Sequence, residues 1–395
     1  MVIHALVSWL HLQFHLPCIA CNALLAILTL LLFFLNPTAT SPFTTLQSGN
    51  RLLGVNRPIH TLPVCPNCRD VYPPASSPRC HDTCTSCHVE LFLPGQTLRG
   101  NTRTLKTPVI KYPYLPLSEQ IASILKIPGI EATLDEWRDK PRKPGMYTDI
   151  FDGNICRTKL KGPDGNLFFS NQTNERGGPN GELRLGVNLG VDCNIAPSHS
   201  SAPTSFSICN LPPEYSIMPG PKEQSPDQVQ RFLWPIVSDL LRLWKHGIKV
   251  PTESRPEGMS NIILCECLLT YLRTACPCCP SHKIGGFASH SHTYFCTECW
   301  ISVADKMNPN AFQQGAFPPR TDAEQRRLGD QYHNLATPNA QKTFVKEYAT
   351  RYSQLSRLPY FDLVAQIVID PMHNLFLGLV KTHFYNIWVQ SKILR

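Results

Sequence analysis

The sequence predicts an α+β fold with three successive parts: an N-terminal helical segment, a zinc-ribbon-like module and an α/β domain. Residues 19–35 are almost all apolar, two C-x-x-C pairs lie fifteen residues apart, and a strand-like alternation at 183–191 precedes a helical pattern at 225–246. We therefore expect an apolar helical segment at 1–40, a linker at 41–64, a Cys-rich zinc-ribbon-like module at 65–110, a helical region and irregular linker at 111–181, and the α/β domain at 182–395.

The N-terminal segment contains no charged side chain. Residues 1–50 lack Lys, Arg, Asp and Glu, and the only polar residues between Ile19 and Leu35 are Asn22 and Thr29. A run of about 17–20 apolar residues just spans a bilayer, so a single-pass membrane anchor at 19–35 is one hypothesis. The missing cations argue against a signal peptide and leave nothing to orient a membrane helix. A buried helix of a soluble domain is the other hypothesis.

The cysteine pairs predict one structural zinc site. Thiolates at positions i and i+3 of a tight turn converge within the roughly 2.3 Å reach of a Zn–S bond. We expect Zn²⁺ to be bound by the four paired cysteines, Cys65, Cys68, Cys84 and Cys87. Cys80 is a fifth candidate, and His81 or His88 is an alternative ligand at one corner. The 17 cysteines are odd in number, which disfavours a simple disulfide framework, but a disulfide or spare-thiol role stays open.

The amino-acid composition gives only weak information about the binding partner of this protein. The net charge of +8 is compatible with binding to nucleic acid. The mixed-sign tract Arg138–Lys143 is typical of a solvated loop, with phosphate contact as the alternative. The 36 prolines predict long irregular connections.

The remaining elements follow from periodicity. Helical patterns occupy 115–138, with a break at Pro128, and 225–246, where Pro235 is expected to introduce a kink. Strands are predicted at 183–191, at 205–211 and, as a central strand, at 262–272. Further helices are expected at 322–335, 339–355 and 372–392. We expect Asp192 to lie at the end of the first strand, beside the strand at 262–272.

Several ordered motifs together resemble fungal CACTA (En/Spm-type) DNA transposases. They are Leu183–Asp192, Met218–Glu223, Lys283–His290, Cys296–Cys299, Leu358–Asp362 and Ile369–Gly378. The resemblance implies an RNase H-like domain in which three acidic residues hold two Mg²⁺ ions for phosphodiester transfer. Asp192 matches the first acid. The resemblance also implies transposon-end DNA as partner, no small-molecule cofactor and a nuclear location. The apolar residues 19–35 leave a membrane location as the alternative.

The chain departs from this family at the other two acids. Pro277 stands where the second acid is expected, and no carboxylate lies between Glu266 and Glu298. The third acid is expected downstream of Asp370, and the sequence stops at Arg395. We therefore expect a truncated, internally degraded RNase H-like transposase domain at 182–395 that is catalytically inactive and retains zinc-dependent DNA binding. An active metal-dependent transposase or nuclease is the alternative, in which Asp239 or Glu266 is recruited.

The resemblance implies a second zinc site. It pairs Cys296 and Cys299 with Asp370 and His373, and two thiolates, one carboxylate and one imidazole are acceptable zinc ligands. The alternative is that Asp370 caps a helix that starts at Pro371.

Overall fold

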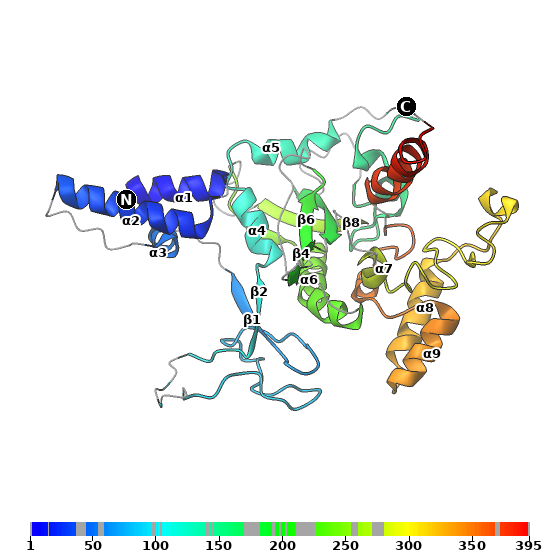
Figure 1. Cartoon of the computed structure of the whole chain (residues 1–395), viewed down its shortest axis with the longest axis horizontal. Helices are drawn as coiled ribbons and strands as arrows, with labels where there is room; N and C mark the ends of the chain where they lie inside the picture. Colours follow the sequence, from blue (N-terminus) through cyan, green and yellow to red (C-terminus); the bar gives the residue numbers. More distant parts are fainter. Residues whose placement is uncertain are drawn as a thin grey trace. The chain divides into compact units, whose positions relative to one another are not determined.

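The computed structural model has mixed α and β structure and divides into two compact units, Met1–Ile59 and His60–Arg395 (Figure 1). This confirms the α+β class. The structure describes residues 2–14, 16–36, 45–53, 59–96, 100, 102, 105–139, 143, 145–169, 182–191, 194–196, 199–201, 204–210, 226–253, 260–270, 280–367 and 372–393. The predicted site residues Asp192 and Asp370, and Pro277, lie outside these ranges.

The first unit consists of three helices, α1 (Val2–Phe14), α2 (Cys18–Leu35) and α3 (Leu46–Leu53). Its core is formed by Val7, Cys21, Leu25 and Leu46. The side chain of Asn22 accepts a hydrogen bond from the backbone N–H of Leu46 at 2.8 Å, which satisfies a donor at the start of α3. Helix α3 lies within residues 41–64, which the composition predicts to be a linker.

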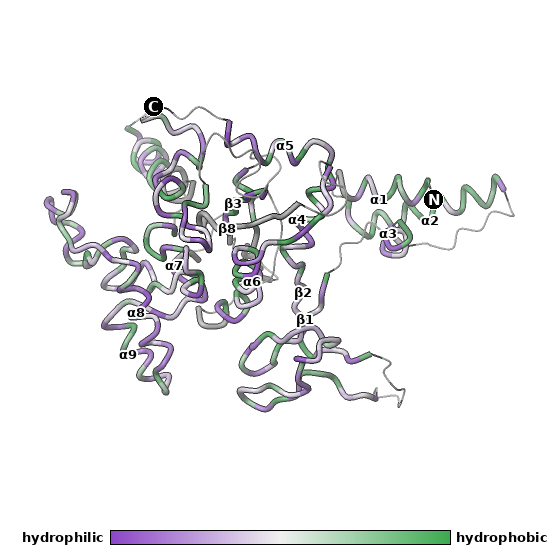
Figure 2. The backbone as a smooth tube through the Cα atoms, turned by 180° about the vertical axis from the view of Figure 1, so that it is seen from behind, coloured by the Kyte–Doolittle hydropathy of each residue, from purple (hydrophilic) through white to green (hydrophobic). Residues whose placement is uncertain are grey.

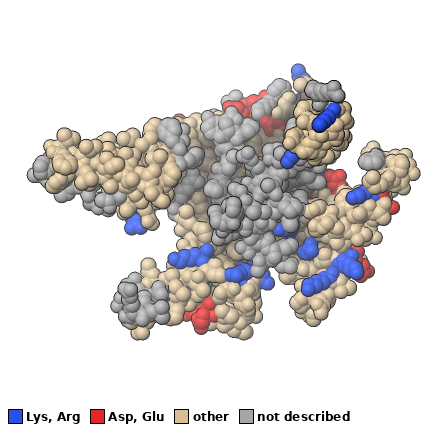
Figure 3. All heavy atoms as spheres, viewed as in Figure 1, with Lys and Arg blue, Asp and Glu red and all other residues tan. Residues whose placement is uncertain are grey.

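Helix α2 presents much of its apolar surface to solvent. It is 18 residues long with a mean hydropathy of 2.6, and only 11% of it is buried. Figure 2 shows its trace mostly in the hydrophobic colour, and Figure 3 shows no charged side chain on α1 or α2. Its length and composition suffice to cross a membrane, but the core helix of a soluble protein or a signal sequence meets the same criteria.

The second unit contains a four-stranded mixed sheet in the order β6-β3-β8-β7. Its strands are β3 (Leu183–Val191), β6 (Thr204–Ile208), β7 (Ile248–Val250) and β8 (Ser260–Thr270). Strand β3 pairs parallel with β8 and antiparallel with β6, while β7 pairs antiparallel with β8. The two predicted central strands are therefore neighbours, and β3 ends one residue before Asp192. Two short strands, β4 (Asn194–Ala196) and β5 (His199–Ser201), form a separate pair.

Helix α6 (Pro226–His246) packs in the same core as β3. Its fully or nearly fully buried residues recur with helical spacing at Leu233, Ile236, Val237, Leu240 and Leu243. Strand β3 contributes Leu183, Leu185, Val187 and Leu189, which share one face because side chains alternate along a strand. The helical and strand periodicities thus produce one continuous core.

An aromatic cluster extends this core. Trp137, Phe151, Phe168 and Phe169 have ring centroids 4.8–5.4 Å apart in the contacting pairs. Arg184 of β3 donates a 2.7 Å hydrogen bond to the backbone carbonyl of Phe168. The elements in this region are α4 (Leu117–Ile124), α5 (Ile130–Asp135), η1 (Glu136–Arg138), η2 (Ile150–Asp152) and η3 (Ile155–Lys159). Gly129, with φ of +75°, forms the predicted break between α4 and α5.

The C-terminal part contains α7 (Pro280–Gly285), η6 (Pro309–Phe312), α8 (Asp322–His333), α9 (Pro338–Tyr348), η7 (Gln354–Arg357) and η8 (Met372–Val389). The Leu358–Asp362 segment enters the main core through Leu358, Tyr360 and Phe361. Arg326 of α8 holds it by donating to the carbonyls of Leu358 and Phe361. Helix α9 ends at Tyr348, earlier than the predicted 355, because Ala349 adopts a left-handed conformation.

Candidate metal centre

The cysteine module is framed by two strands. Strands β1 (His60–Val64) and β2 (Ile110–Tyr114) pair antiparallel, with His60 opposite Tyr114 and Val64 opposite Ile110. This pairing brings the two ends of the module together. Both C-x-x-C pairs lie between these strands, and the first follows β1 directly.

The first cysteine pair lies in a tight turn. The backbone N–H of Cys65 donates to the carbonyl of Asp70 at 2.9 Å, and the N–H of Arg69 donates to the carbonyl of Cys65 at 3.1 Å. The N–H of Cys68 points to the Cys65 sulfur at 3.4 Å. We call this turn, residues 64–71, the first knuckle. Its hydrogen bonds turn both sulfurs toward the same point.

The second knuckle, residues 83–90, repeats the first nineteen residues later in the chain. The N–H of Cys84 donates to the carbonyl of Val89 at 2.8 Å, and the N–H of His88 donates to the carbonyl of Cys84 at 2.9 Å. The residue after each second cysteine is left-handed, with φ of 68° at Arg69 and 59° at His88. That conformation costs a residue other than glycine about 1–2 kcal/mol.

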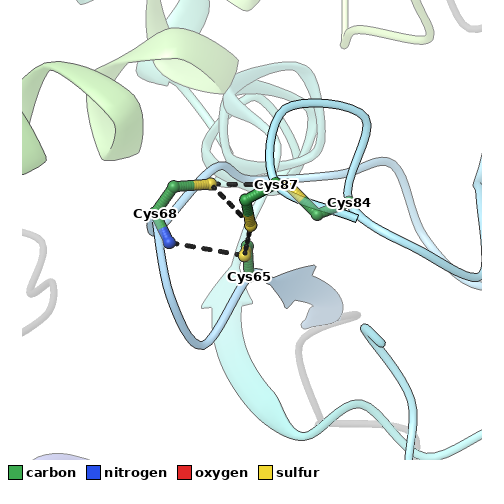
Figure 4. A group of neighbouring side chains, drawn as sticks. All are labelled: Cys65, Cys68, Cys84 and Cys87. Carbon is green, nitrogen blue, oxygen red and sulfur yellow. Dashed lines mark hydrogen bonds between the residues drawn. The ribbon is translucent and has the colours of Figure 1, made fainter. Parts of the chain in front are cut away.

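The two knuckles bring four sulfurs together (Figure 4). The Sγ atoms lie within 4.8 Å of one another, with Cys65–Cys87 and Cys68–Cys84 at 3.4 Å and Cys68–Cys87 at 3.9 Å. Four Zn–S bonds of about 2.3 Å in a tetrahedron place sulfurs about 3.8 Å apart. All four cysteines are free thiols, and Cys65 and Cys84 are fully buried. The group could therefore hold a metal ion such as zinc.

The alternative ligands lie outside this group. Cys80 directs its thiol to the carbonyl of His81 at 3.7 Å, and its pKa is raised by burial. His88 occupies the left-handed position of the second knuckle rather than a place among the sulfurs. Within the described residues the group that could hold a metal ion is thus the four predicted cysteines.

Tyr72 contacts one of the ligands. Its hydroxyl donates to the Cys84 sulfur at 3.2 Å and accepts from the N–H of Thr85 at 2.9 Å. Burial raises the pKa of Cys84, but hydrogen bonds from Tyr72 and from the backbone of Cys87 and Ser86 outweigh it and lower that pKa to about 6. Burial raises the pKa of Cys68 well above its usual range. A metal ion bound here would displace the proton of the Cys68 thiol.

Asp70 links the two knuckles to helix α6. One carboxylate oxygen accepts from the Cys68 thiol at 3.1 Å and from the Ser86 hydroxyl at 2.8 Å. The other oxygen forms an ion pair with Arg231 of α6. The spacing of the cysteines gives no signal for Asp70, Tyr72 or Arg231, because these contacts join residues distant in the chain. An acidic residue two positions after the first cysteine pair was the only available hint.

The second predicted zinc site is only half described. Cys296 and Cys299 are half-buried free thiols in an irregular segment, and burial raises the pKa of Cys299. His373 belongs to η8, but its side chain, like all of Asp370, lies outside the described part. Beside the cysteines, Arg320 stacks on the Trp300 ring at 3.6 Å. The pairing of the four residues stays a prediction.

Asp239 and Glu266, the two carboxylates considered as additional ligands of catalytic metal ions, lie in different surroundings. Asp239 of α6 accepts from the Tyr114 hydroxyl and from the N–H of Leu117 at 3.3 Å, so it holds the start of α4 on α6. Glu266 lies opposite Val187 in the parallel β3–β8 register, and its side chain is outside the described part. Asp239 is thus occupied by structural contacts.

Comparison with known proteins does not assign the chain to a family. No protein-family model matches the chain, and no curated protein matches it. The chemistry of the centre therefore has to be argued from its geometry.

Proposed function

We propose that this chain is a transposon-derived, CACTA-transposase-like protein that binds zinc and nucleic acid and does not transfer DNA strands. The observation on which this proposal rests is the group of four sulfurs within 4.8 Å of one another. Four-cysteine sites of this spacing are typical of structural zinc in small modules. A nuclear location follows from the proposal.

The charge distribution supports nucleic acid as the partner. Residues 60–114 contain six Lys and Arg against three Asp and Glu. Two of the three acids are paired, since Asp70 binds Arg231 and Asp82 binds Lys106 at 2.5 Å. A surplus of positive charge in this segment of the sequence favours contact with phosphates.

The absence of strand transfer is supported by the carboxylates. Two-metal chemistry needs acids that converge on ions about 3.5–4 Å apart. Asp239 is occupied by Tyr114 and Leu117, and no carboxylate is present in the sequence between Glu266 and Glu298. Asp192 alone does not provide such a site.

Zinc analysis and DNA binding of the purified full chain test the proposal. We expect one zinc per chain under reducing conditions from the four-cysteine group, and duplex binding that weakens with salt and disappears after chelation. Incubation with Mg²⁺ or Mn²⁺ should give no nicked or joined DNA. Nicking that Asp192→Ala abolishes would establish the active transposase or nuclease instead, and a zinc-loaded chain without affinity for DNA would refute the binding function.

A membrane role is the second candidate, favoured by the exposed apolar surface of α2. Ile27, Leu30, Phe33 and Phe34 are each more than half exposed. An anchor predicts that the full chain stays with membranes after carbonate extraction and that Leu30→Lys with Leu31→Lys releases it. Recovery of the unaltered chain in the soluble fraction would exclude an anchor.

A further inference from the structure

The two knuckles share a choice of residue that the cysteine geometry alone does not explain. Arg69 and His88 occupy equivalent left-handed positions, each directly after a ligand cysteine. Glycine adopts this conformation without strain and would close the same turns. Two strained side chains at matched positions indicate that these side chains themselves have a role.

Neither side chain is held by a polar contact within the described structure. Arg69 is half-buried and His88 is exposed, and neither forms a side-chain hydrogen bond or ion pair with another described residue. The neighbouring Asp70 forms its ion pair with Arg231 of α6 rather than with Arg69. Both groups are therefore available as donors to a ligand outside the chain.

Arg69 and His88 lie beside the cysteine sulfurs, where their side chains can offset the repulsion between a zinc–thiolate centre and a phosphate. Zinc bound by four thiolates has a formal charge of −2, which repels a phosphate that approaches the knuckles. Consecutive Cα atoms are about 3.8 Å apart, so Arg69 and His88 stand next to Cys68 and Cys87. An Arg side chain can bind a phosphate through two parallel hydrogen bonds, and an imidazole N–H can donate to a second one.

We propose that Arg69 and His88 are paired phosphate contacts through which the knuckles bind a nucleic-acid backbone. This inference rests on the proposed nucleic-acid binding and specifies the residues that perform it. Contacts to the backbone alone would bind duplexes of different sequence with similar affinity, because phosphates contain no sequence information.

The decisive variant is the full chain with Arg69→Gly and His88→Gly together. Glycine removes both side chains and relieves both backbone conformations, so zinc retention against a chelator and resistance to unfolding should stay equal or increase. Affinity for a mixed-sequence DNA duplex and for an RNA of equal length should fall roughly three- to tenfold, and the salt dependence of binding should decrease by about one released ion or more. If Arg69 and His88 had a purely structural role, the double variant would not keep its stability while losing affinity for nucleic acid.

The matched control is Arg79→Gly, which removes an exposed cation from the loop between the knuckles. It should leave affinity and salt dependence near those of the unaltered chain. If the unaltered chain binds nucleic acid and the double variant binds equally well, the inference is wrong and the proposed function stands. If the double variant loses zinc, Arg69 and His88 serve to stabilise the metal site and the inference is also wrong. If the unaltered, zinc-loaded chain binds neither DNA nor RNA, the proposed function itself fails.

Discussion

At the residue scale, the environment of each sulfur decides its chemistry. Cys84 is fully buried yet has its pKa lowered to about 6, because Tyr72 and backbone N–H groups donate to its sulfur against the effect of burial. Cys68 faces Asp70 and has its pKa raised, first by burial. The thiols of Cys68 and Cys84 thus differ before any metal binds, and the difference originates in the residues that surround them.

Replacing Cys68 by Ser should abolish zinc binding and unfold the module locally. Structural zinc contributes on the order of 10 kcal/mol to folding of small zinc peptides, and a three-cysteine site loses most of that contribution. Metal content and limited proteolysis of residues 60–114 measure the effect. Cys80→Ser is the control, since its thiol lies outside the group of four. Equal zinc content in the two variants would contradict the assignment.

Replacing Tyr72 by Phe should weaken metal binding without preventing it. The change removes the hydroxyl that donates to the Cys84 sulfur at 3.2 Å, so the pKa of Cys84 should rise. Loss of such an outer contact typically reduces metal affinity 10- to 100-fold. Competition with a chelator of known affinity measures it. An unchanged affinity would show that the hydroxyl serves only to hold Thr85.

Asp152 should make the sheet-bearing unit sensitive to acid. Hydrogen bonds from the backbone N–H of Thr148 at 2.9 Å and from Arg157 at 2.6 Å lower the pKa of Asp152 to about 2. A lowered pKa stabilises the fold above the ordinary value near 4, and this contribution disappears as pH falls from about 4 toward 2. Asp152→Asn should be less stable than the unaltered chain at neutral pH, and the difference should vanish near pH 2 in chemical denaturation. A constant difference across that range would refute this account.

At the element scale, α6 has two functions that depend on different faces. Leu240 and Leu243 are fully buried against the core that β3 shares. Arg231 and Phe232 instead contact the cysteine module, since Arg231 pairs with Asp70 and the carbonyl of Phe232 accepts from the Tyr112 hydroxyl at 3.5 Å. One helix therefore both covers the sheet and fixes the module beside it.

Truncating the core face of α6 should destabilise the unit strongly. Leu240→Ala removes a fully buried side chain, and such substitutions cost about 2–5 kcal/mol because a cavity remains. Lys245→Ala, at an exposed position of the same helix, should change the stability by less than about 0.5 kcal/mol. Chemical denaturation of both variants provides the comparison. Similar losses would mean that α6 does not pack as described.

At the scale of the whole molecule, the metal centre and the sheet belong to one compact unit, His60–Arg395. Contacts between described residues join them through α6, among them Asp70 with Arg231, Tyr112 with the backbone at Phe232, and Tyr114 with Asp239. Asp70 also touches the Cys68 thiol, so the residue that joins the module to α6 is in contact with the metal ligands. Metal loading and attachment of the module should consequently influence each other.

Removing Arg231 should loosen the module from α6 while zinc stays bound. The ion pair is partly exposed, with 38% of the Arg231 side chain and 26% of the Asp70 side chain accessible, so solvent screening limits their coupling to about 1 kcal/mol or less. A double-mutant cycle of Arg231→Ala and Asp70→Asn measures that coupling. Faster proteolysis between β2 and α4 with unchanged zinc content is the expected result, and loss of zinc from Arg231→Ala would contradict it.

The sequence by itself determined the local features of this protein. The spacing of Cys65, Cys68, Cys84 and Cys87 identified the group that the structure brings together, and the alternation at 183–191 identified β3. It also placed α6 to within a residue and indicated that β3 and β8 would be neighbours. Such features are visible because two- and 3.6-residue periods and short ligand turns are properties of adjacent residues.

Only the tertiary structure decided which residues surround the site. Asp70 meets Arg231 and Tyr114 meets Asp239 more than 100 positions away in the chain, and no period or motif connects them. The same contacts engage Asp239 and join the cysteine module to the sheet. The left-handed turns at Arg69 and His88 were also invisible in the sequence, since closure of the knuckles around the sulfurs imposes a conformation that neither residue prefers.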